Sequence, residues 1–83
     1  MELKHIKKEI IYIIEKITDN IVLNEDSVLI ESGINSMQII QIVVELEHRF
    51  NFEFEDEKLS YETLRTIGSI AEYVYQQTSG EDQ

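Results

Sequence analysis

Asn35 and Ser36 are the residues whose types and position suggest chemistry, because they stand where a small polar turn meets an apolar run, SGINSMQII. Both side chains are good helix N-caps, since each accepts a hydrogen bond from the first-turn N–H groups, but one cap is enough. If Asn35 caps the helix, Gln38 falls at N3 and can reach back in a capping box. If Ser36 caps it, Asn35 is a loop residue. The local spacing allows both arrangements.

With Asn35 as the cap, the Ser36 hydroxyl has no capping task. An anion attached to it would lie at the positive end of the helix dipole, where negative charge is stabilised. Gly33 precedes the pair and allows the chain to turn sharply, because glycine adopts backbone conformations that other residues avoid. In this arrangement Ser36 offers a free hydroxyl at a helix end that favours an anion, with Asn35 and Gly33 beside it; if Ser36 is the cap, it offers none.

A catalytic serine is a third interpretation of Ser36, and the sequence disfavours it. The stretch lacks the glycine that follows the serine in a nucleophile elbow. His48 lies about three turns further along the same helix, too far to act as the base, and His5 is the only other histidine. Glu45 and His48 have the spacing of a di-iron half-motif, but the sequence holds no second copy, so we expect no metal site.

The elements that must position this stretch are predicted to be helices. The chain has 83 residues, the size of one domain, with no proline and three glycines. Residues 3–17 place leucine or isoleucine every three or four positions, which predicts a helix with one buried face. Residues 18–35 predict a long loop with polar clusters and apolar anchors, and a loop of that length is often functional.

A second helix is expected over Ser36–Phe50 and a short third helix near Asp56–Tyr61, with acids in its first turn. Thr66 is the expected N-cap of a last helix, because an apolar period begins directly after it. We therefore predict an all-α fold, a small four-helix bundle with a long first loop and a short third helix. The domain is expected to span residues 1–78, followed by a disordered tail over 79–83.

The predicted second helix is apolar on more than one face. Its core face is expected to hold Ile39, Ile42, Val43, Leu46 and Phe50. Met37, Ile40 and Val44 form a second stripe, about 100–160° from the first. Either neighbouring helices cover part of this stripe, or it is a docking surface for a partner protein with a polar, acidic rim. In the second case the docking residues are Met37, Ile40, Gln41, Val44, Glu45, Glu47 and His48.

The formal net charge is -10, and the acids are concentrated in the middle of the chain. Residues 19–63 hold eleven acids against Arg49 and Lys58, whereas residues 1–18 are nearly balanced. An acidic surface repels phosphate backbones, so we expect no nucleic-acid partner. Such a surface attracts basic partners, although acidity also serves solubility alone.

Cysteine is absent, which excludes disulfides and thiolate metal sites. No run of about 18 apolar residues occurs, so we expect no membrane span. The first ten residues, MELKHIKKEI, mix acids and bases and lack the apolar core of a secretory signal. We expect a cytoplasmic location and a monomeric state.

The segment from Leu29 to Met37, LIESGINSM, resembles the modification site of acyl and peptidyl carrier proteins, where a leucine precedes Gly-x-Asp-Ser and Leu or Met follows. The likeness continues, in the family's order, through Leu46-Glu47, Phe50, Phe52-Glu53-Phe54, Thr66-Ile67-Gly68-Ser69-Ile70 and Tyr73-Val74. It implies a four-helix bundle in which Ser36 carries a 4′-phosphopantetheine arm, attached from coenzyme A by a phosphopantetheinyl transferase. It also implies a carrier and not an enzyme, whose arm holds an acyl or aminoacyl group as a thioester.

The resemblance implies partners as well, namely acyl-activating, synthase or transferase enzymes that place basic patches against the helix after the serine. Asn35 departs from the family, which usually has Asp there. Asn caps a helix about as well, but it removes a negative charge that bears on which transferase acts. We expect a freestanding carrier, and the alternative is an unmodified interaction module that docks through Met37, Ile40 and Val44. Fatty acid, polyketide, nonribosomal peptide and aminoacyl systems share these features, so the pathway and the cargo stay open.

Overall fold

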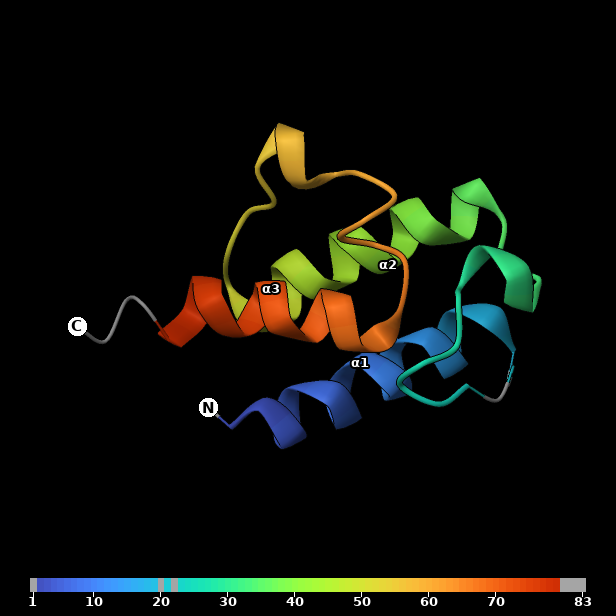
Figure 1. Cartoon of the computed structure of the whole chain (residues 1–83), viewed down its shortest axis with the longest axis horizontal. Coiled ribbons are helices and arrows are strands. Elements are labelled where there is room, and N and C mark those ends of the chain that lie inside the picture. Colours follow the sequence, from blue (N-terminus) through green and yellow to red (C-terminus); the bar gives the residue numbers. More distant parts are fainter. Residues whose placement is uncertain (1, 20, 22, 80–83) are drawn as a thin grey trace.

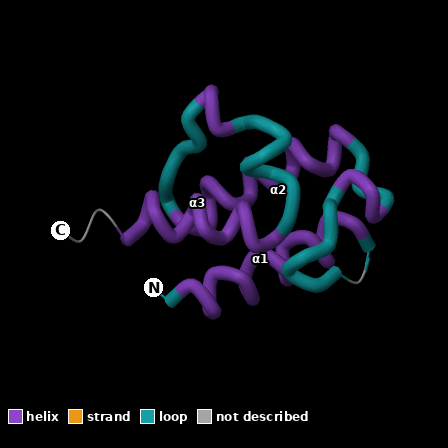
Figure 2. The backbone as a smooth tube through the Cα atoms, viewed as in Figure 1, coloured by secondary structure: helices purple, strands orange, loops and turns teal. Residues whose placement is uncertain are grey.

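Three α-helices build the core of the part of the chain that the structure describes, with long connections between them (Figures 1 and 2). The computed structural model describes residues 2–19, 21 and 23–79. The helices are α1 (Leu3–Thr18), α2 (Ser36–Phe50) and α3 (Ile67–Ser79). Short 3₁₀-helices lie in the connections, η1 (Ile30–Ser32) and η2 (Asp56–Lys58). In these described residues, no helix is both long enough and apolar enough to cross a membrane.

The first helix is the centre of the packing, because it contacts both α2 and α3. Figure 1 shows α2 and α3 both running in the direction opposite to α1. The isoleucines predicted from the three- and four-residue period supply its buried face, which holds Ile6, Ile10, Ile13 and Ile14. The opposing faces of α2 and α3 supply Ile42, Val43, Leu46, Phe50, Ile67, Ile70, Ala71 and Val74. The predicted core face of α2 is therefore confirmed, except that Ile39 is only partly buried.

The connection after α2 is held by its aromatic residues and by one carboxylate. Asn51 ends α2 in the left-handed conformation at φ 56°. Phe54 then packs against Tyr73 of α3, with ring centroids 5.1 Å apart. The Glu47 carboxylate accepts a hydrogen bond from the Phe54 N–H at 2.8 Å, and the Tyr73 hydroxyl accepts one from the Glu55 N–H at 3.1 Å. The chain is thus attached to both α2 and α3 where the connection begins.

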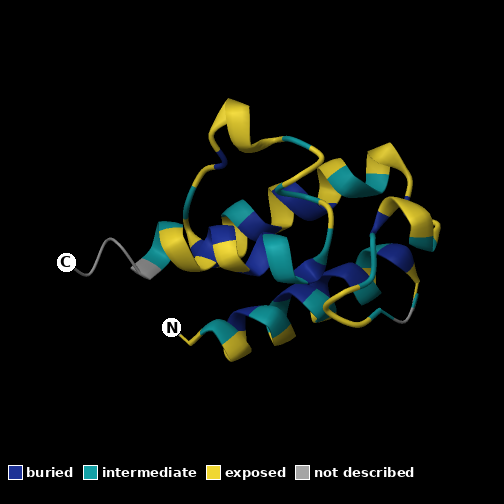
Figure 3. Ribbon diagram, in the orientation of Figure 1, coloured by how far each residue is buried: buried dark blue, intermediate teal, exposed yellow. Residues whose placement is uncertain are grey.

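The short third α-helix expected near Asp56–Tyr61 is not present in that form. The structure has instead the three-residue 3₁₀-helix η2, which ends where Leu59 leaves helical conformation at ψ 65°. All residues of η2 are exposed (Figure 3). A short helix without a buried face lacks the packing that offsets the cost of helix nucleation. The four-helix count is accordingly not confirmed, whereas the all-α fold is.

The long first loop is anchored to the start of α3. Buried Leu29 donates its N–H to the Arg65 carbonyl at 2.9 Å, and the Gly68 N–H donates to the Glu25 carbonyl at 3.1 Å. Lys7 of α1 adds an ion pair to Glu25 at 2.9 Å. These contacts hold the loop close to the bundle, so that it delivers the chain to the first residue of α2 in a defined position.

Thr66 caps α3, as the sequence predicted. Its hydroxyl accepts the Ser69 N–H at 3.0 Å, and the Ser69 hydroxyl accepts the Thr66 N–H at the same distance. Ser79 is the last residue of α3, and residues 80–83 of the predicted tail lie outside the described residues.

We predict that Leu46→Ala lowers the free energy of unfolding by about 2–5 kcal/mol, because a fully buried side chain is replaced by a cavity. Urea denaturation followed by circular dichroism measures the change. Val44→Ala is the matched control on the same helix, since that side chain is exposed and its truncation is expected to cost no more than about 0.5 kcal/mol. Equal losses in the two variants would contradict the assigned faces of α2.

Tyr73→Phe is expected to lower the free energy of unfolding by about 0.5–1.5 kcal/mol, because the Glu55 N–H loses its acceptor while the ring packing is kept. The same denaturation experiment measures it. Tyr75→Phe, on the exposed side of α3, is the control and is expected to be neutral. If Tyr73→Phe leaves the free energy of unfolding unchanged, the hydrogen bond to the Glu55 N–H does not stabilise the connection.

Candidate functional site

The N-terminus of α2 is closed by a capping box between Asn35 and Gln38. The Asn35 Oδ1 accepts the Gln38 N–H at 2.9 Å, and the Gln38 Oε1 accepts the Asn35 N–H at 3.1 Å. Asn35 is extended at φ -86° and ψ 172°, as an N-cap residue is. The structure therefore decides the alternative that the sequence left open: Asn35 is the cap, and Ser36 is the first helical residue.

The Ser36 hydroxyl has no hydrogen-bond partner among the residues that the structure describes. Its residue is exposed, and within the described part of the chain no hydrogen bond joins this hydroxyl to another group. It lies at N1, where the unpaired N–H groups of the first turn give the helix end a partial positive charge. A hydroxyl in this position is accessible to an enzyme, and its modification would break no bond of the fold.

The turn before the site needs a glycine, and an apolar pair directs the chain into the helix. Gly33 has φ 94°, a conformation that side chains other than glycine rarely adopt, and it directly follows η1. Ile34 at N′ is 3% exposed and Ile39 at N4 packs against the same core, which is the pattern of a hydrophobic staple. This apolar pair is a sequence signal that favours Asn35 over Ser36 as the cap, and the capping preferences of the two residues do not contain it.

An apolar cleft with a volume of about 310 Å³ opens beside Ser36. Three segments contribute to it: η1, α2 and the connection before α3. Its lining consists of Ile30, Ser36, Ile39, Ile40, Leu59, Ser60, Tyr61 and Leu64. The residues from η1 and the connection were not predicted as part of the site. Their sequence signal is weak, namely large apolar side chains in otherwise polar connections.

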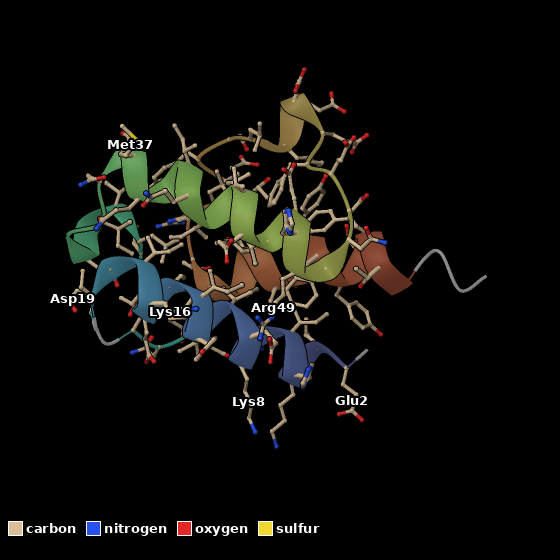
Figure 4. The ribbon with its side chains drawn as sticks, turned by 180° about the vertical axis from the view of Figure 1, so that it is seen from behind. Glu2, Lys8, Lys16, Asp19, Met37 and Arg49 are labelled. Carbon is tan, nitrogen blue, oxygen red and sulfur yellow. The ribbon has the colours of Figure 1, made fainter. Side chains whose placement is uncertain are left out.

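The second apolar stripe of α2 is exposed. Met37, Ile40 and Val44 are 68%, 59% and 51% exposed, and Figure 4 shows Met37 projecting from the start of α2 away from α1. Neighbouring helices therefore do not cover it. Gln41, Glu45 and His48 beside it are exposed too. Glu47 differs, because its carboxylate is engaged with the Phe54 N–H and its residue is half-buried.

The histidines are not placed for catalysis at Ser36. His48 lies on α2 twelve residues further on, about 18 Å along the helix axis. His5 is on α1, where its Nε2 lies 3.8 Å from the Glu9 carboxylate. Among the residues described, no group of three or more His, Cys, Asp or Glu side chains is arranged to hold a metal ion.

The arrangement fits the phosphopantetheine arm that the resemblance implies. A phosphodiester needs a serine oxygen that is accessible and not required by the fold, and the Ser36 hydroxyl meets both conditions. The negative charge would lie at a helix N-terminus, and the arm would leave along an open apolar cleft.

Comparison with known proteins gives the same assignment. Residues 8–74 match the family model described as the phosphopantetheine attachment site. Acyl carrier proteins from Clostridium perfringens strains SM101 and 13 are 31% identical over 70 residues, which cover 77% of this chain and 90% of theirs. The acyl carrier protein of Wolinella succinogenes is 32% identical over 53 residues, 63% of this chain and 67% of that protein. No solved structure matches the chain.

The match to the family model covers most of the chain, including all of α2 with its capped start and the larger part of α1 and α3. The capped helix start, with a neighbouring serine hydroxyl left unused, is what a covalent attachment site requires. The chain therefore belongs to the acyl and peptidyl carrier proteins, which are carriers and not enzymes and whose cofactor is 4′-phosphopantetheine.

Proposed function

We propose that this carrier protein is modified at Ser36 and presents acyl or aminoacyl thioesters to biosynthetic enzymes. The proposal is carried by the hydrogen bonds at the start of α2. The capping box between Asn35 and Gln38 closes the helix end, so the exposed Ser36 hydroxyl is not needed for capping. The proposal includes a monomer acting in the cytoplasm, as expected from the sequence.

The attachment step uses one group of this chain, the Ser36 hydroxyl. Ser36 Oγ forms the new bond to phosphorus and gives its proton to a base of the phosphopantetheinyl transferase. The pyrophosphate bond of coenzyme A breaks, and 3′,5′-adenosine bisphosphate leaves. When bound, phosphopantetheine would supply the thiol that forms the thioester. This chain has no thiol of its own, because it has no cysteine.

The chain's own residues then position the attachment point and its cargo. The anchored loop and the capping box hold Ser36 in one place relative to the bundle. Ile39, Leu59 and Leu64 line the cleft beside it and offer apolar surface to an acyl group. A tether attached here also raises the local concentration of substrate at an enzyme that has docked on the same helix.

The exposed stripe of α2 is proposed as the docking surface for those enzymes. Met37, Ile40 and Val44 form its apolar centre, and exposed Gln41, Glu45 and His48 form a polar rim, the usual organisation of an interface. Glu45, and the free side of the Glu47 carboxylate, would meet basic groups of the partner. Transferases, acyl-activating enzymes and synthases are the proposed partner classes.

We predict that Ser36→Ala abolishes attachment, because no other hydroxyl takes its place. Mass spectrometry after incubation with coenzyme A and a phosphopantetheinyl transferase measures this as loss of the mass of one phosphopantetheinyl group. Ser32→Ala is the control and is expected to be modified fully, since the Ser32 hydroxyl is already bonded to the Val28 carbonyl at 2.9 Å.

The unfolding free energy of Ser36→Ala is expected to stay within about 0.5 kcal/mol of the original, because the hydroxyl makes no bond in the fold. Modification of the Ser36→Ala protein would disprove the assignment. An unmodified interaction module, the alternative function, would show no added mass on the original protein with any of several transferases.

We predict that replacing Ile40 and Val44 together by serine lowers the kcat/KM of modification by a transferase about a hundredfold, because each exposed side chain loses apolar contact of about 1.5 kcal/mol. Steady-state kinetics with coenzyme A measures it. Tyr75→Ser on α3 removes an exposed apolar side chain elsewhere and is expected to leave kcat/KM unchanged. If the double variant keeps the original kcat/KM, the stripe is not part of the surface on which the transferase docks.

A further inference from the structure

We propose that Asn35 is a positioning residue whose neutrality is matched to the anion on Ser36, so that attachment of the phosphodiester stabilises the fold of this protein. The inference rests on the proposed function, since it requires Ser36 to be the attachment point. It goes beyond that function because it assigns a thermodynamic consequence to modification and a role to the residue beside the serine.

The two polar atoms of the Asn35 side chain have different environments. Oδ1 must be the atom that faces the helix, because it accepts the Gln38 N–H at 2.9 Å. Nδ2 is left as an exposed donor, and among the described residues it has no hydrogen-bond partner. The other member of the box is also an amide, Gln38. The cap is therefore complete without any charge, and it keeps a donor at the side chain next to Ser36.

The helix end at Ser36 and the lining of the adjacent cleft are uncharged as well. The sequence has no charged residue between Glu31 and Glu45, and α2 has no acid in its first turn. All residues that line the cleft beside Ser36 are uncharged, including Ser60 and Tyr61 from the connection before α3. A phosphodiester would hence be the first charge at this helix end, where the dipole favours a negative one.

An aspartate in place of Asn35 would add a negative charge at the start of α2 and would still cap the helix. Asp caps a helix about as well as Asn, and its carboxylate would itself interact with the dipole before modification. After modification, two negative charges would stand on adjacent residues and repel each other. Asn35 thus leaves the favourable interaction with the helix end to the attached group.

Thermal unfolding of the unmodified and modified forms tests the inference. In low salt, modification is expected to raise the Tm of the original protein by about 2–6 °C, the size of a dipole interaction in a domain of this length. The gain is expected to disappear in Asn35→Asp. Gln76→Glu is the matched control, because it adds the same charge at an exposed position of α3 and should keep the gain. High salt should reduce the gain by screening.

A second measurement does not depend on any transferase. Ser36→Glu places a negative charge at the same position, and it is expected to raise Tm in the original background but not in the Asn35→Asp background. The Gln76→Glu background again serves as the control. This double-mutant cycle keeps the inference testable if Asn35→Asp is modified poorly.

The outcomes separate this inference from the proposed function. If Ser36 is modified and the Tm gain is the same with Asn35 and with Asn35→Asp, the role of Asn35 is refuted while Ser36 stays the attachment point. Equal effects of Ser36→Glu in the two backgrounds refute it in the same way. If no modification of Ser36 occurs in the original protein, the proposed function fails and the inference fails with it.

Discussion

The two hydrogen bonds between Asn35 and Gln38 are the interaction on which the site depends. They satisfy donors at the start of α2, so the helix end needs no hydrogen bond from the Ser36 hydroxyl. Were Ser36 the cap, its hydroxyl would be engaged with a backbone N–H, and modification would compete with helix stability. Because the box is closed by two amides, the fold and the chemistry draw on different side chains. A carrier that must be modified without unfolding requires this separation.

The rest of the molecule serves to hold that helix end in place. α1 is the common packing partner, and its isoleucine face fits the apolar faces of α2 and α3. Within their described residues the two long connections carry no α-helix, yet both are held by specific contacts. The first is bonded to the start of α3 through the Gly68 N–H, and the second is bonded to the middle of α3 through the Tyr73 hydroxyl. The cleft beside Ser36 exists because these two connections meet α2 on the same side.

Charge divides α2 into two parts with different physical roles. The first part, up to Val44, carries no charge and combines a helix N-terminus with exposed apolar residues. The second part carries Glu45, Glu47 and Arg49; Glu47 also supports the following connection through the Phe54 N–H, and Arg49 pairs with Glu9 of α1. An attached anion is favoured in the first part and would be repelled in the second. A basic partner is attracted chiefly to the second, so the two interactions do not compete for the same surface.

The sequence by itself determined the helices that pack, their core faces and the position of the candidate serine, because these depend on local periodicity and on residue type. It also predicted the second apolar stripe of α2, but only the structure shows that neighbouring helices leave it exposed. Capping preference alone could not choose between Asn35 and Ser36 as the cap, since both side chains can accept N–H groups of the first turn. Burial of Ile34 and the positive φ of Gly33 made that choice, and both depend on how the loop packs on the bundle. The cleft residues Leu59 and Tyr61, and the reduction of the third helix to a 3₁₀ turn, were likewise decided by tertiary structure. A segment that buries no face of its own takes its conformation from the elements it connects.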